Sequence, residues 1–209
     1  MLRLLFRHLL MCLLLLGGAV AARSNPIPGL HDTGVDGAGV VLPVGSAEQH
    51  YVLTGPSSAP FVIVPLYTWI QAPSGSAWIG PTDGSVTDPP GQYVYTMSFS
   101  LLGLDPVSAI ISGNWASDNG AVIRLNGVDT GNQNGSGRVP FESLHSFSIT
   151  FGFVAGLNVL EFVVTNEPPG GLNPTGLLVA NISGHADPPI GIEPCTWGKA
   201  KRMYGVPSR

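Results

Sequence analysis

Glycine and proline divide this chain into short segments, and this limits the folds open to it. The 209 residues include 28 glycines and 19 prolines, nearly twice the average usage of roughly 12% for the two together. Residues 92–101 alternate apolar and polar side chains, a period typical of a β-strand with one buried face. No convincing amphipathic helical period follows residue 22. The chain is therefore expected to fold from strands and turns.

Other short apolar segments bounded by turn-forming residues have the length and composition of strands. They are residues 50–53, 61–65, 107–115, 121–125, 145–153, 157–165 and 176–183. In the segment 145–153 the predicted buried face carries Phe147, Ile149, Phe151 and Phe153. Asn126-Gly127 predicts a type I′ hairpin, because both residues tolerate positive φ angles. Eight to ten strands predict an all-β fold, an antiparallel β-sandwich, with a closed barrel as the alternative.

The two ends of the chain differ from its body. Residues 1–22 have the basic start, short apolar run and small residues of a secretory signal peptide, and a retained membrane anchor is the alternative. Residues 23–45 form an irregular lead-in, residues 46–187 the β-sandwich domain, and residues 188–209 a basic tail. Cleavage leaves Cys195 as the only cysteine, so no internal disulfide is expected. We expect a secreted protein without a stable membrane span.

Charge is unevenly distributed. Residues 24–193 hold all 13 acidic residues and only two basic ones, Arg124 and Arg138. With two basic residues against 13 acidic ones, this segment cannot neutralise the phosphates of a nucleic-acid backbone. Nucleic-acid binding is therefore excluded as an expected function.

Several segments of the body resemble galactose-binding-like jelly rolls of secreted bacterial proteins of the PEP-CTERM class. The first is Gly-Asn-Trp-Ala-Ser-Asp-Asn-Gly at 113–120, followed by an apolar strand that ends in Leu-Asn-Gly at 125–127. The second is the pair 147–153 and 160–166, joined through Gly-Leu-Asn at 156–158. The resemblance covers roughly residues 50–185 and implies a jelly-roll β-sandwich.

Proteins of that class end in a Pro-Glu-Pro box, a transmembrane helix and a basic cluster, which together form a sorting signal. Residues 192–197 resemble a degenerate form of the box, and Lys199, Lys201 and Arg202 resemble the basic end. The helix between them is missing. The tail is accordingly predicted to be either a decayed sorting signal or an ordinary disordered terminus.

Patterns for known catalytic or zinc chemistry are absent. His31, His50, His145 and His185 are scattered and have no zinc-ligand spacing with Cys195. We expect them to face solvent or lie in turns. A glycoside hydrolase needs two carboxylates across the scissile bond, and the loose acidic residues (Asp83, Asp88, Asp118, Glu142, Glu161) do not single out a pair. The protein is expected not to be an enzyme.

Calcium prefers carboxylate and carbonyl oxygens, which acidic, glycine-rich loops supply. Asp32 and Asp36, in the segment Asp-Thr-Gly-Val-Asp-Gly, are the best local pair. The alternative is that these side chains hydrogen-bond their own backbone in turns. A structural calcium ion at Asp32 and Asp36 is therefore a hypothesis for a cofactor.

Carbohydrate recognition combines an aromatic platform with a few polar groups. The predicted ligand-binding residues are Trp69, Trp78, Asp83, Asn114, Asp118, Asn119 and Arg124. A turn is the alternative for Asp118-Asn119, and a salt bridge to a neighbouring carboxylate such as Glu161 is the alternative for Arg124. The leading hypothesis is a non-catalytic module that binds a polysaccharide or cell-surface glycan. The alternative is a structural or adhesive matrix protein without a small-molecule ligand.

Overall fold

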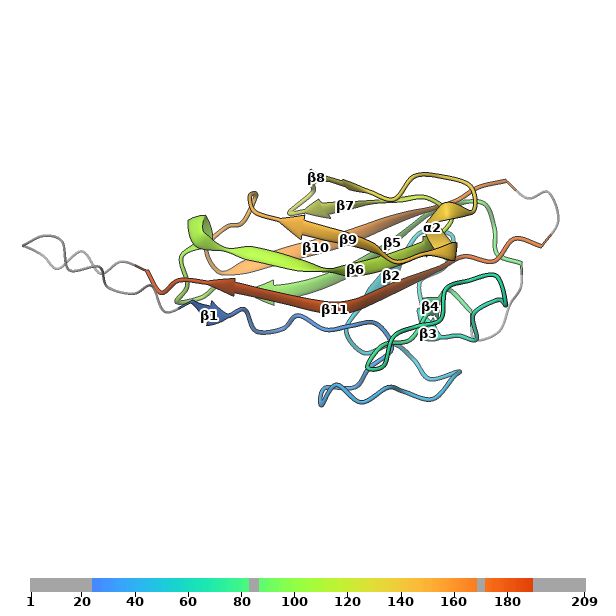
Figure 1. Ribbon diagram of the computed structural model, residues 1–209, viewed down its shortest axis with the longest axis horizontal. Helices are drawn as coiled ribbons and strands as arrows, with labels where there is room; N and C mark the ends of the chain where they lie inside the picture. Colours follow the sequence, from blue (N-terminus) through green and yellow to red (C-terminus); the bar gives the residue numbers. More distant parts are fainter. Residues whose placement is uncertain (1–23, 83–86, 169–171, 190–209) are drawn as a thin grey trace, which may run out of the picture.

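The computed structural model describes residues 24–82, 87–168 and 172–189. These form two stacked antiparallel sheets (Figure 1). The strands are β1 (Asn25–Pro26), β2 (Val52–Thr54), β3 (Phe61–Val62), β4 (Ile79–Gly80), β5 (Gly91–Ser100), β6 (Ile110–Asp118), β7 (Ala121–Leu125), β8 (Val128–Gln133), β9 (His145–Ile149), β10 (Leu157–Asn166) and β11 (Gly176–Ala186). A short 3-10 helix η1 (Pro106–Ser108) and a helix α2 (Val139–Glu142) complete the elements. Within these described parts, neither helix is long and apolar enough to span a bilayer.

The strand order is that of a jelly roll. One sheet runs β3-β4-β11-β6-β9, with β1 also paired to β11, and the other runs β2-β5-β10-β7-β8. From β4 onward, the chain passes to the opposite sheet at every connection except the β7–β8 hairpin. That architecture has two four-stranded sheets, which are here β4-β11-β6-β9 and β5-β10-β7-β8. The predicted antiparallel β-sandwich is confirmed.

Alternation along each strand builds the core between the sheets. On β5, Tyr93, Tyr95, Met97 and Phe99 are buried, and the residues between them face outward. Aromatic rings fill the centre, with Trp115 of β6 and Phe162 of β10 at a ring-centroid distance of 5.7 Å. Each fully buried large apolar side chain contributes roughly 1.5–3 kcal/mol. The core therefore holds the two sheets together without a disulfide among the described residues.

A second, smaller core lies on the outer face of the β11 and β6 strands. It consists of Trp69, Trp78, Ala116, Phe141 and Leu178, all buried. The Trp69 and Trp78 rings lie 4.4 Å apart, and the Trp78 indole donates a hydrogen bond to the carbonyl of Ile70 at 2.9 Å. This cluster attaches the loop before β4 and helix α2 to the sheet.

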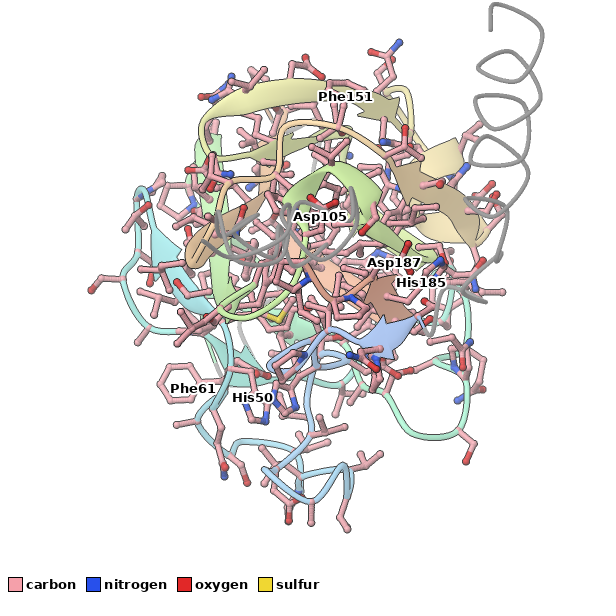
Figure 2. All side chains as sticks on the ribbon, turned by 90° about the vertical axis from the view of Figure 1, so that its left-hand side faces the viewer. His50, Phe61, Asp105, Phe151, His185 and Asp187 are labelled. Atoms are coloured by element: carbon pink, nitrogen blue, oxygen red, sulfur yellow. The ribbon has the colours of Figure 1, made fainter. Side chains whose placement is uncertain are left out.

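One predicted strand is shorter than its pattern suggested. The segment 145–153 leaves the sheet after Ile149, and Phe151 is 54% exposed. Figure 2 looks onto the end of the sandwich where Phe151 lies, together with Asp105 and Asp187. The prediction that Phe151 is buried is wrong, because the chain turns at Gly152, which has a φ of +86°. Within the lead-in of residues 23–45, Val35 and Val41 form a single antiparallel bridge.

The predicted hairpin at Asn126-Gly127 is confirmed. Both residues have positive φ, 54° and 78°, as a type I′ turn requires. The Asn126 side chain also accepts from the amide of Val159 and donates to the side chain of Asn158, both at 2.9 Å. The turn is thus tied to the start of the neighbouring strand β10.

We predict that Gly127→Ala lowers the free energy of unfolding by about 1–2 kcal/mol, the cost of a left-handed backbone for a residue with a Cβ. Space is not the cause, since nothing lies within 4 Å of a Cβ built at Gly127. Gly37→Ala is the matched control, because Gly37 is equally open and lacks a positive φ. Urea unfolding measures both. Equal stabilities for the two variants would contradict the hairpin geometry.

Candidate functional site

Loops that cross between the sheets meet at the end of the sandwich that carries α2 (Figure 1). Residues of these loops line a small pocket. The pocket has a volume of about 160 Å³. Its apolar walls come from Leu66, Trp69, Phe141, Leu172 and Pro174, and its polar groups from Thr68, Asp118, Asn119, Arg138 and Asn173. We call this the Asp118 pocket. It brings together three predicted site residues, Trp69, Asp118 and Asn119.

Asp118 is the last residue of β6 and is only 4% exposed. Its backbone carbonyl accepts a hydrogen bond from the Thr175 hydroxyl, but its Oδ1 atom is buried without any partner. Burial raises the pKa of this carboxyl to about 7. A hydrogen bond from the Trp69 side chain acts in the opposite direction, and the charge of Glu167 raises the pKa further. Asp118 is therefore a buried acid that titrates near neutral pH and has an unused acceptor.

Asn119 fixes the loop beside this acid. Its side-chain carbonyl accepts from the amide of Glu167 at 3.0 Å, and its amide donates to the carbonyl of Gly137 at 3.4 Å. Its backbone carbonyl accepts from the Ser117 hydroxyl at 2.7 Å. The side chain of Asn119 thus joins three loops, so the pocket wall is held in place before any ligand binds.

The two tryptophans do not form an exposed platform. Trp78 is 1% exposed and Trp69 is 6% exposed, so their ring faces pack in the second core. Trp69 lines the Asp118 pocket, and Trp78 does not. The sequence could not show that the segment with these tryptophans folds back over the sheet, because that packing involves residues far apart in the chain.

Arg124 lies apart from the pocket, on the outer face of β7. It lines an open cleft of about 420 Å³ together with Gln92, Asp129, Gln133, Thr165 and Glu167 over a floor that includes Val122 and Val163. We call this the Arg124 cleft. Glu161 stands opposite Arg124 on β10, but the ion pair found in the described residues is Arg138–Glu142 at 3.1 Å. The alternative of a salt bridge to Glu161 is therefore wrong.

Two predicted residues do not join either site. Asn114 is half-buried on β6, between Ala180 of β11 and Ser146 of β9, and lines neither the pocket nor the cleft. Asp83 lies outside the described residues, as do the predicted signal peptide and residues 190–209.

Asp32 and Asp36 bind backbone amides. Asp32 accepts from Asn181 at 2.9 Å and Ile182 at 2.8 Å, at the irregularity in β11. Burial raises the pKa of Asp32. Asp36 accepts from Ala38 and Val40, both at 2.9 Å, and these bonds lower its pKa. Within the described ranges no three His, Cys, Asp or Glu residues converge as a metal site. Calcium stays a prediction, which a calcium-dependent melting temperature would test.

Sequence reasoning missed a pair of histidines. His31 and His50 stack with ring centroids 3.6 Å apart and planes within 5° of parallel. Burial, followed by the neighbouring His50, lowers the pKa of His31, whereas Asp32 raises it. The two residues are 19 positions apart in separate loops, so no local spacing could have indicated this contact.

Solved structures that resemble this chain include three with 12–16% sequence identity. No protein-family model matches it, and no curated protein does. A CBM35 from Paenibacillus barcinonensis is 16% identical with a TM-score of 0.34, over 63% of this chain and 93% of that one. A family 35 carbohydrate binding module from an environmental isolate is 12% identical with a TM-score of 0.29, over 56% and 82%.

A β-glucosidase from Kluyveromyces marxianus is 12% identical with a TM-score of 0.32, over 90% of this chain and 22% of that one. Scores of this size establish neither a shared fold nor a shared function. The jelly-roll assignment rests on the strand order of this chain.

We predict that Asp118→Asn changes how stability depends on pH. Because the folded pKa of Asp118 is raised to about 7, its stabilising contribution is present at acidic pH and is lost as pH rises through 7. The asparagine variant lacks this loss, so its stability relative to the native chain should increase from about pH 5 to about pH 8, by at most a few kcal/mol. Urea unfolding across this range measures the difference. Parallel curves would contradict the assignment.

Proposed function

We propose that this protein is a secreted, non-catalytic module that binds carbohydrate, with the Asp118 pocket as its binding site. The observation that carries the proposal is that Asp118, which lines that pocket, has a buried carboxyl group whose Oδ1 atom lacks a hydrogen-bond partner. Leaving a buried polar atom without a hydrogen bond costs roughly 1–3 kcal/mol. A ligand hydroxyl that donates to Asp118 removes this cost.

The remaining walls suit a sugar ring. Leu66 and Phe141 offer apolar surface to C–H groups, and Thr68, Asn173 and Arg138 offer hydrogen-bonding groups around them. The volume of about 160 Å³ suits a single ring or chain end rather than a long polymer segment. An apolar pocket with a few convergent polar groups and a perturbed acid is typical of ligand sites.

Hydrolysis is not part of the proposal. Asp118 is the one carboxylate among the described residues that line the pocket, whereas glycoside hydrolysis generally uses two. The pocket supplies a hydrogen-bond acceptor and a shaped wall, which suffice for binding.

The structural or adhesive alternative depends on exposed sheet edges. At the β9 edge, the Asn132 side chain donates to the carbonyl of Ser148 at 3.0 Å and accepts from its amide at 3.4 Å. This pairing occupies the backbone groups that a second chain would need, a common way of blunting an edge. It favours the binding module over assembly through this edge.

We predict that affinity gels containing galactomannan, xylan, glucomannan, dextran or polygalacturonate retain the protein on at least one of them. Asp118→Asn should weaken that binding about tenfold, because a charge-assisted hydrogen bond becomes a neutral one. Binding should also tighten as pH rises toward about 7, since the ionised form of Asp118 is the better acceptor.

Asp88→Asn is the matched control. Asp88 is also buried with a pKa raised by burial, but it accepts from the Thr175 amide and does not line the pocket. It should leave retention unchanged. Failure of all five gels to retain the native protein would refute the proposed function, and release of reducing ends would refute its non-catalytic part.

A further inference from the structure

The Arg124 cleft contains a guanidinium group that has no partner among the described residues. Arg124 lies in one row with Glu161 of β10 and Asp129 of β8, its direct partners across the two neighbouring strands. Within the described parts of the chain, its guanidinium has neither an ion pair nor a side-chain hydrogen bond. A donor group of this size that has no protein partner and lies in an open cleft is available to a ligand.

The charges of the cleft select against anions. Asp129 and Glu167 line it beside the single guanidinium, and Glu161 belongs to the same row. An acidic polymer would meet a net negative surface and be repelled. A hydroxyl group, by contrast, can donate to these carboxylates and accept from the guanidinium. Gln92 and Gln133 add amides that do both.

The floor suits the apolar side of a sugar chain. Val122 and Val163 lie opposite each other on β7 and β10. Val122 is half-buried and presents apolar surface to the cleft, whereas Val163 is only 2% exposed. Side chains on paired strands form a rigid base, and the volume of about 420 Å³ exceeds that of the Asp118 pocket. The cleft therefore has room for more than the single ring that suits the pocket.

The pocket and the cleft adjoin each other. Asp118 and Asn119 line the pocket, and the next two residues, Gly120 and Ala121, line the cleft. The loop 135–138 contributes in the same way, with Gly135 and Ser136 on the cleft and Arg138 on the pocket. A Cβ at Gly120 would collide with the carbonyl of Gly135, so the two loops touch and form one ridge between the two sites.

We propose that the Arg124 cleft is a second subsite, which binds an uncharged polysaccharide segment that continues from the sugar held in the Asp118 pocket. This inference rests on the proposed function for its ligand class. It adds the requirement that the bound polymer is neutral and longer than one ring. Arg124 makes the cleft specific for hydroxyl groups, because it supplies the cationic hydrogen-bond donor among acidic acceptors.

The test uses disaccharides and hexasaccharides of the cello, manno and xylo series, together with a galacturonate hexasaccharide, titrated calorimetrically into the purified protein. A neutral hexasaccharide should bind about tenfold more tightly than its disaccharide. Arg124→Met should abolish this gain in affinity with length. Gln133→Ala, a second change in the cleft at an exposed position, should reduce the gain.

Gln49→Ala is the matched control for Gln133→Ala, because Gln49 is also an exposed glutamine and lines neither the cleft nor the pocket. It should preserve the gain with length. The inference is overturned if Arg124→Met keeps the gain, if length brings no gain, or if the galacturonate hexasaccharide binds more tightly than every neutral one. If no sugar binds the native protein, the proposed function fails as well, so the two failures are distinguishable.

Discussion

Packing of two inward sheet faces against each other is the interaction on which the rest of this structure depends. Without a disulfide among the described residues, the sandwich is held by apolar side chains that alternate along β5, β6, β10 and β11. This alternation also fixes the register, since a slip of one residue would turn each core side chain to solvent. The polar residues between them are thereby placed on the two outer faces.

The jelly-roll order places the candidate binding groups at the crossings between sheets. Asp118 ends β6 just where the chain leaves for β7, and segments before β11 and around α2 cross at the same end. The acid is buried because these loops and the second core close over it. A buried acceptor without a hydrogen-bond partner destabilises the folded protein. Binding a ligand hydroxyl that donates to this acceptor is a physical reason for its presence.

Arg124 illustrates a different constraint, since its position follows from strand alternation. In β7 the residues on either side of it, Ile123 and Leu125, enter the core, so Arg124 must point outward. The sequence could identify Arg124 as unusual, but whether it forms an ion pair depends on side-chain geometry across strands. The register does place Glu161 opposite it, yet the expected salt bridge does not form.

The sequence alone determined the fold class, most strand positions and the Asn126-Gly127 turn, because these depend on periods of two and on φ preferences that act within a few residues. It also indicated Asp118, Asn119 and Trp69 as residues of interest. Only the tertiary structure decided that Trp69 and Trp78 are buried, that His31 stacks on His50, and that Asp118 lies in a pocket beside the Arg124 cleft. Those outcomes depend on how loops far apart in the chain pack over the sheets, and no local pattern records that packing.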